Sequence, residues 1–145
     1  MKDTTKKTLY VFVFALVIVL IDQVIKSVIS KKIILGESVW FITYIQNTGA
    51  AFGIFKDATM LFIWAAIIVI GAVLAFYDKI PKKTDIRIYA GLILGGAVSN
   101  LIDRMMFGYV IDYIDLKVWP AFNLADAAIT IGVIGVIIYL LRKKK

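Results

Sequence analysis

The chain has 145 residues, of which 61% are hydrophobic, and it carries a formal net charge of +7 with neither cysteine nor histidine. This apolar share exceeds that of an ordinary soluble domain, so the sequence predicts one membrane-embedded domain covering residues 1–145. The missing residue types exclude disulfides, thiolate nucleophiles, Ser-His triads and histidine-based zinc sites, and neither metal nor cofactor is expected. The basic residues stand in short clusters between apolar runs, which is typical of loops flanking membrane spans and disfavours nucleic-acid binding.

Four apolar windows are long enough to cross a bilayer, and each must be helical because lipid offers no partner for an open backbone. They lie near residues 8–29, 59–77, 86–107 and 121–141. The expected fold class is therefore an all-α membrane protein with four transmembrane helices. The first window is expected to stay uncleaved, because it lacks the small-residue site at which secretory signal peptides are cut.

The basic clusters also predict which side of the membrane each connector faces. They precede the first span, join the second to the third and follow the fourth: Lys2, Lys6, Lys7, Lys79, Lys82, Lys83, Arg87 and Arg142 to Lys145. Four spans place all three clusters on one side, so both termini are predicted to be cytoplasmic. With a rise of about 1.5 Å per residue, polar residues of the first, third and fourth spans then lie about 21 to 25 Å above the inner face. This shared level, just under the outer surface, indicates one common site.

In the first span, Asp22 and Lys26 are four residues apart and therefore share a helix face. One interpretation is an ion pair at the helix end, with Lys26 reaching outward to the membrane surface. The other is that Asp22, together with Gln23, supports the common site. The spacing leaves both open.

The first connector, residues 30–58, is rich in β-branched and aromatic residues, which predicts a short hairpin at the outer face. Trp40 and Tyr44 are expected at the level of the lipid headgroups. Asn47 begins a turn sequence, and the small residues from Gly49 onward permit a close backbone approach.

The third span places Asn100, Asp103 and Arg104 on one helical stripe, and Gly95 and Gly96 let another helix approach closely. An arginine at this depth is expected to have a carboxylate partner, for which Asp103 or another aspartate is available. The group is interpreted either as a buried ion-pair lock between helices or as part of the site. The two roles are compatible, since a site needs a rigid frame.

Two acids lie at the entrance to the fourth span. Asp112 follows the third span and Asp126 lies just inside the fourth, where a carboxylate in lipid is costly unless it is neutralised, paired or functional. Two carboxylates held together share a proton, which suits the activation of water against an amide. Asn123 is interpreted either as a site residue or as the N-cap of the fourth helix, with Asp126 near its third position. Spacing alone does not favour Asp112 over its neighbour Asp115.

With these residues in view, the chain resembles the lipoprotein signal peptidases (signal peptidase II). Five motifs occur in order over nearly the whole length: D-Q-x-x-K at Asp22–Lys26, N-x-G-A-A-F at Asn47–Phe52, G-G-A-x-x-N-x-x-D-R at Gly95–Arg104, V-x-D at Val110–Asp112 and F-N-x-A-D at Phe122–Asp126. One departure is Tyr113, which stands where phenylalanine is usual.

The resemblance implies an intramembrane aspartyl endopeptidase that removes the signal peptide from diacylglyceryl-modified prolipoproteins, cutting before the lipidated cysteine. It selects Asp112 and Asp126 as the catalytic dyad in preference to Asp115. It also implies a small extracytoplasmic β-cradle from the first connector and inhibition by globomycin-type cyclic peptides. Residues expected to bind substrate or to support the dyad are Asp22, Lys26, Asn47, Gly49, Asn100, Asp103, Arg104 and Asn123.

In the expected mechanism, the unprotonated carboxylate of the dyad takes a proton from water while its protonated partner polarises the scissile carbonyl. The expected setting is the bacterial inner membrane, with the site near the extracytoplasmic face, a monomeric enzyme, and membrane lipids and lipid-modified precursors as partners. The alternative is a small proton-coupled membrane transporter, in which acids within the spans relay protons. The second span, which is almost wholly apolar, and the apolar inner halves of the first and fourth spans disfavour it.

Overall fold

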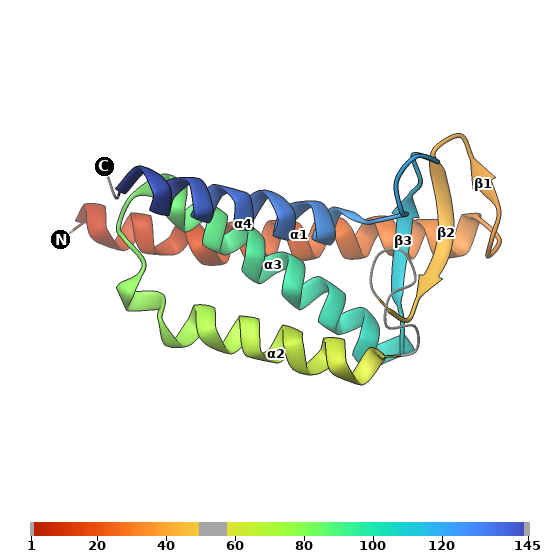
Figure 1. Cartoon of the computed structure of the whole chain (residues 1–145), viewed down its shortest axis with the longest axis horizontal. Coiled ribbons are helices and arrows are strands. Elements are labelled where there is room, and N and C mark those ends of the chain that lie inside the picture. Colours follow the sequence, from red (N-terminus) through yellow and green to blue (C-terminus); the bar gives the residue numbers. More distant parts are fainter. Residues whose placement is uncertain (1, 50–57, 144–145) are drawn as a thin grey trace.

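The computed structural model describes residues 2–49 and 58–143. Helix α3 (Thr84–Phe107) is central and contacts the other three helices. Figure 1 shows it crossing the bundle obliquely, while α1 (Lys2–Lys32) and α4 (Leu124–Lys143) run along the long axis of the molecule. The two ends of the chain lie at one end of the bundle, and a small sheet lies at the other (Figure 1).

Three of the four predicted spans are helices long and apolar enough to cross a membrane: Leu9–Lys32, Thr84–Phe107 and Leu124–Arg142. The remaining one, α2 (Thr59–Ala75), is helical but has only 17 residues. At about 1.5 Å per residue it extends about 26 Å, slightly less than a hydrocarbon layer about 30 Å thick. A short 3₁₀ turn, η2 (Tyr77–Lys79), follows it at the end of the bundle opposite the sheet.

The helix faces that point away from the bundle are apolar, as lipid requires. Large hydrophobic side chains are exposed there in every helix, among them Leu16, Leu20, Val24, Ile68, Ile134 and Leu141. Because hydrocarbon is as apolar as these side chains, burying them would bring no hydrophobic gain inside a membrane, and helices associate there by close packing and polar contacts instead.

Two glycines allow α3 to pack tightly between α1 and α4. A Cβ atom on Gly95 would lie 2.6 Å from the carbonyl oxygen of Ala15 in α1. A Cβ on Gly96 would collide with the carbonyl oxygen of Ala125 in α4. The predicted close helix approach at this glycine pair is therefore confirmed, and it brings the polar residues of three helices within reach of one another.

The sheet has three antiparallel strands in the order β1-β2-β3. The predicted hairpin is present as β1 (Ser38–Val39) and β2 (Ile42–Asn47), with the exposed Trp40 at its turn. The third strand, β3 (Val110–Ile114), comes from the connector after α3 and was not predicted. The fold is therefore mostly helical with a small sheet built from two connectors. The part of the predicted Asn47–Phe52 motif beyond Gly49 lies outside the described residues.

Candidate active site

Asp112 lies in the middle of β3 and is only 2% exposed. The pairing of β3 with β2 brings Asn47 beside it, and Asn47 Nδ2 donates a hydrogen bond to Asp112 Oδ2 at 2.8 Å. Asn123 Nδ2 donates to the other carboxyl oxygen, Oδ1, at 2.9 Å. Burial and then the negative charge of Asp126 raise the pKa of Asp112 to about 7, although both amide hydrogen bonds act in the opposite direction. This carboxyl group therefore gains and loses a proton near neutral pH.

Asp126 lies in the first turn of α4 and forms a reciprocal pair with the residue that caps the helix. The side-chain oxygen of Asn123 accepts from the Asp126 main-chain N–H at 2.8 Å, and Asp126 Oδ2 accepts from the Asn123 N–H at 3.2 Å. This is the capping-box arrangement, which holds the third residue of a helix against its cap. The other oxygen, Asp126 Oδ1, accepts from Asn100 Nδ2 at 2.8 Å.

Asn123 therefore contacts both acids of the predicted dyad, and both acids line one cavity of about 730 Å³. The polar part of the cavity lining is Asn47, Gly49, Asn100, Arg104, Asp112, Asp126 and Thr130, while Phe62, Ala65, Val69, Ile93 and Ile129 are among the apolar lining residues. The two carboxyl groups thus face one cavity whose wall is mostly apolar.

Asp115, the competing acid, has different surroundings. Its carboxylate pairs with Lys117 at 2.8 Å, where the lysine side chain is 60% exposed, and it also accepts the Lys117 main-chain N–H. These contacts lower the pKa of Asp115, so it is an ordinary ionised acid on a loop. It does not line the cavity.

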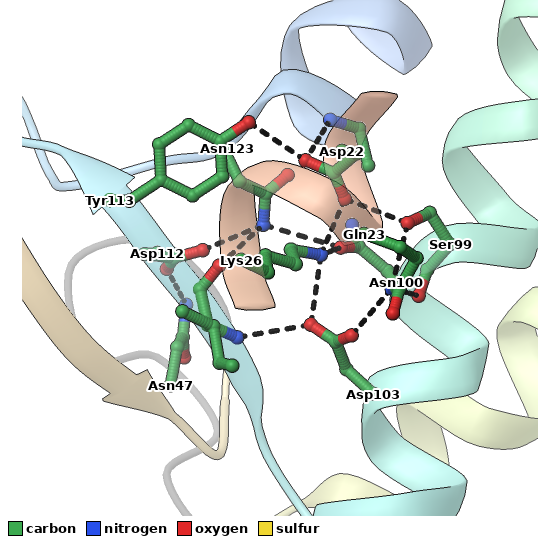
Figure 2. Close-up of polar contacts among 12 residues, drawn as sticks. Asp22, Gln23, Lys26, Asn47, Ser99, Asn100, Asp103, Asp112, Tyr113 and Asn123 are labelled. Carbon is green, nitrogen blue, oxygen red and sulfur yellow. Dashed lines mark hydrogen bonds and ion pairs between the residues drawn. The ribbon is translucent and has the colours of Figure 1, made fainter. Parts of the chain in front are cut away.

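Lys26 points into the bundle, where its Nζ atom lies 2.6 Å from Asp22 Oδ2 and 2.8 Å from Asp103 Oδ2. The same atom donates to Asn100 Oδ1 at 3.1 Å, and Figure 2 shows it pointing between these groups. The expected Asp22 pair is present, but the interpretation that Lys26 reaches outward is wrong, because this side chain is 1% exposed. Carboxylates on both α1 and α3 hold the ammonium group inside.

A second group of contacts ties this cluster to the start of α4. Tyr113 Oη donates to Asp22 Oδ1 at 2.9 Å and accepts from the Leu124 N–H at 3.0 Å. Asp22 Oδ1 also accepts from the Ala125 N–H at 3.3 Å, and its Oδ2 accepts from Ser99 Oγ at 2.7 Å. Asn123 accepts the Asp126 N–H, so the first three N–H groups of α4 all have side-chain partners.

Arg104 lines the cavity, and the carboxylate partner expected for it is not found among the described residues. Its guanidinium carbon lies 5.0 Å from the Phe62 ring centre, and its Nη2 approaches the Gly49 carbonyl oxygen at 3.5 Å. Within residues 2–49 and 58–143, no ion pair joins it to an acid, and its buried Nε has no hydrogen-bond partner. The nearest acid on its own helix, Asp103, is engaged by Lys26 and by Gln23 Nε2 at 2.7 Å instead.

The structure thus places the predicted residues in two connected groups. Asp112, Asp126, Asn47, Asn100, Asn123, Gly49 and Arg104 surround or line the cavity, and Asp22, Lys26 and Asp103 form the buried charged cluster behind it. Sequence reasoning assigned no site role to Ser99 or Tyr113. The available signal was their polarity inside apolar segments, since a buried hydroxyl requires a partner.

Known proteins share this sequence and arrangement. The family profile described as signal peptidase (SPase) II matches residues 14–142. A lipoprotein signal peptidase of Halothermothrix orenii is 42% identical over 141 residues, covering 93% of this chain and 97% of that relative. One of Staphylococcus carnosus is 39% identical, covering 88% and 89% of the two chains. A solved bacterial membrane enzyme, obtained by the in meso method at 2.3 Å, matches with a TM-score of 0.85 and 34% identity over 93% of this chain and 89% of its own.

Proposed function

The chain belongs to the signal peptidase II family, a family of membrane proteases, and we propose that it cleaves the signal peptide from diacylglyceryl-modified prolipoproteins, cutting before the lipidated cysteine. The observation that carries the proposal is the contact of Asn123 with both Asp112 and Asp126 at the edge of one cavity. A pair of carboxyl groups that share a proton is the equipment of an aspartic peptidase.

In the proposed reaction, the dyad begins with one proton. The unprotonated carboxylate takes a proton from a water molecule as the oxygen of that water attacks the scissile carbonyl carbon. The protonated partner donates a hydrogen bond to the carbonyl oxygen. Collapse of the tetrahedral intermediate breaks the C–N bond, and the leaving amine takes a proton from the dyad. No covalent intermediate forms. Since the two groups titrate as a unit, the starting proton belongs to the pair rather than to one residue.

The amides around the dyad supply orientation. Asn47 and Asn123 donate to the two oxygens of Asp112, while Asn100 donates to Asp126. Fixed donors of this kind keep each carboxyl group in one rotamer, so that water and substrate meet a prepared geometry. These amides are supported by the ion-paired cluster of Lys26, Asp22 and Asp103. The cavity in which the substrate backbone would lie is bordered by Gly49 and Arg104.

For the membrane arrangement, we propose that α2 completes a set of four spans with both termini cytoplasmic and the site near the extracytoplasmic face of the bacterial inner membrane. The basic η2 region and both chain ends lie at the opposite end of the bundle from the sheet, which supports this orientation (Figure 1). The apolar cavity wall from α2, α3 and α4 suits the signal helix, with the acyl chains left in lipid. The enzyme is proposed to be a monomeric single domain that globomycin-type peptides inhibit.

The transporter alternative receives no support. A proton path requires polar residues continuing toward the inner face. Among the described residues, the polar residues of the site are joined to strand β3 by hydrogen bonds of Asp112, Tyr113 and the Ile111 N–H. The cavity at the inner end is lined mainly by apolar side chains such as Ala72, Val73 and Leu140. The buried Arg87 at that end donates to the carbonyl oxygens of Ile80 and Pro81, which anchors the connector between α2 and α3.

The proposed function is tested with purified full-length protein in lipid and two forms of one precursor. The form that carries the diacylglyceryl group is expected to release its signal peptide, and the form with an unmodified cysteine is expected to stay intact. Mass spectrometry of the products locates the cut before the lipidated cysteine. Equal cleavage of both precursors, or cleavage of neither, would contradict the proposal.

A further inference from the structure

The side-chain amide of Asn100 has contacts that admit only one orientation. Its oxygen accepts from Lys26 Nζ at 3.1 Å and from Asn123 Nδ2 at 3.2 Å, and its NH₂ group donates to Asp126 Oδ1 at 2.8 Å. A rotated amide would direct N–H groups at two donors and an oxygen at a carboxylate, so three attractive contacts would become repulsive. The orientation that serves Asp126 therefore depends on what faces the amide from behind.

Lys26 is the charged group behind that amide. An ammonium group has three N–H donors, and this one has three acceptors, on Asp22, Asp103 and Asn100. With the side chain 1% exposed, no water competes for the third donor. The positive charge therefore fixes the Asn100 oxygen and, through the same planar amide, directs the NH₂ group toward Asp126.

We propose that Lys26 is a positioning residue for the peptidase reaction. Acting through Asn100, it holds a hydrogen-bond donor on Asp126, and its buried positive charge stabilises the ionised carboxylate of the dyad. The inference deepens the proposed function and rests on it. It assigns the D-Q-x-x-K motif an effect on the chemical step in addition to its contribution to helix packing.

The charged groups around Lys26 determine in which direction the loss of its charge shifts the pH profile of kcat. Asp22 faces it from its own helix and Asp103 from α3, and the dyad acids face it from β3 and α4. Tyr113 from β3 is neutral and hydrogen-bonded to Asp22, and Arg104 lies on the cavity side near the dyad acids. Lys26 opposes the effect of burial on Asp112. Without its charge, the dyad would hold protons more tightly, so both limbs of the pH profile of kcat would move to higher pH.

The experiment measures kcat and KM against pH for the lipid-modified precursor, using full-length variants in lipid. Lys26→Met is expected to lower the maximum of the kcat profile about tenfold, because the donor on Asp126 is no longer held in place, and to move both limbs upward by about one pH unit, which corresponds to a tenfold change in proton affinity. KM is expected to change less than about twofold, because Lys26 does not line the cavity. Lys26→Arg keeps the charge and is expected to restore the limbs to their wild-type positions.

Two further variants separate positioning from folding. Lys26→Met leaves Asp103 buried without its cation, so the double variant Lys26→Met with Asp103→Asn removes one charge of each sign and relieves that cost while the contact with Asn100 stays lost. Lys31→Met removes an exposed charge from the same helix and is expected to leave the profile unchanged. A purely structural role for Lys26 predicts less folded protein but a wild-type rate and pH profile per folded molecule. An unmoved profile in Lys26→Met, or a wild-type kcat per folded molecule in the double variant, would overturn the inference. Failure of the wild-type protein to cleave would instead overturn the proposed function.

Discussion

Asn123 has two roles because its amide carries both an acceptor and donors. The oxygen caps α4 by accepting the Asp126 N–H, and the NH₂ group donates to Asp112. The helix-cap interpretation is therefore confirmed, and the same amide also contacts one of the proposed catalytic acids. The same contact that begins the helix sets the position of one proposed catalytic acid relative to the other.

Tyr113 offers a test of how the α4 start is held. Tyr113→Phe keeps the buried ring but removes the hydroxyl that joins Asp22 to the Leu124 N–H. Leaving that N–H without its acceptor is expected to cost about 1 kcal/mol of stability and to speed hydrogen exchange at the start of α4. Tyr109→Phe is the matched control, because its hydroxyl shares a hydrogen bond with the Tyr44 hydroxyl at 3.3 Å and does not contact the start of α4. Unchanged exchange at the α4 start in Tyr113→Phe would show that the hydroxyl contributes nothing there.

The raised pKa of Asp112 predicts how cleavage depends on pH. Below about 7 this carboxyl group keeps its proton, and above that value the dyad loses the proton that the reaction needs, so kcat should fall as pH rises through about 7. Asn47 donates to the ionised form of Asp112 and so lowers the pKa. Asn47→Leu is therefore expected to move the falling limb to higher pH.

The control for this shift is Gln46→Leu, on the same strand, whose amide donates to Tyr44 and does not contact Asp112. Its falling limb should coincide with that of the wild type. A limb that stays in place in Asn47→Leu, or that moves to lower pH, is incompatible with a donor that stabilises the ionised carboxylate.

Among the elements, α3 decides whether the charged cluster assembles. The glycine at position 95 lets α1 approach until Lys26 and Asp22 reach Asn100 and Ser99. Gly95→Ala would press a methyl group against the main chain of Ala15, and overpacking of this kind costs about 1 to 3 kcal/mol. We expect a lower unfolding temperature together with slower cleavage per folded molecule.

Gly71→Ala in α2 is the matched control, because no atom of the part of the chain that the structure describes lies within 4 Å of the added methyl group. It should leave both the unfolding temperature and the cleavage rate close to the wild-type values. If the two alanine variants behaved alike, the close contact between α1 and α3 would have no special role in assembling the cluster.

The limits of prediction from sequence are clearest in these elements. The apolar windows predicted the helices, and the cost of charge in lipid pointed to Asp126 and to the acids of the connector before it, without separating Asp112 from Asp115. Strand β3 was missed because its partner, β2, lies 65 residues away at the Asn47–Asp112 contact, and such pairing leaves no local pattern. The inward direction of Lys26 was missed because spacing shows which residues share a helix face but not what that face meets.

The same distinction explains the choice between the two acids of the connector. Asp112 and Asp115 are three residues apart in one polar segment, so composition and spacing treat them alike. At the level of the sequence, only the resemblance of the motifs separates them. In the fold, Asp112 is drawn into the interior by β-pairing, while Asp115 stays with Lys117 on the loop beyond the strand.

For the molecule as a whole, the proposed orientation can be tested by chemical labelling, because the chain has no cysteine of its own. Val118, in the loop before α4, is 89% exposed, and Lys82 is exposed in the connector between α2 and α3. In intact spheroplasts, a membrane-impermeant maleimide is expected to label Val118→Cys but not Lys82→Cys. Lysis should make both variants reactive. The reverse pattern, or labelling of both from outside, would contradict the proposed orientation.

The proposed mechanism requires the carboxyl groups of Asp112 and Asp126 to act together. The decisive measurement is the rate of signal-peptide release from a lipid-modified precursor by Asp112→Asn and Asp126→Asn, with Asp115→Asn as the matched control. Loss of the acid–base pair should slow cleavage by about 10²- to 10⁴-fold in protein that still inserts and folds. The control should remain within about twofold of the wild type, as expected for a surface substitution. Near-normal cleavage by either dyad variant would contradict an aspartic mechanism at this site.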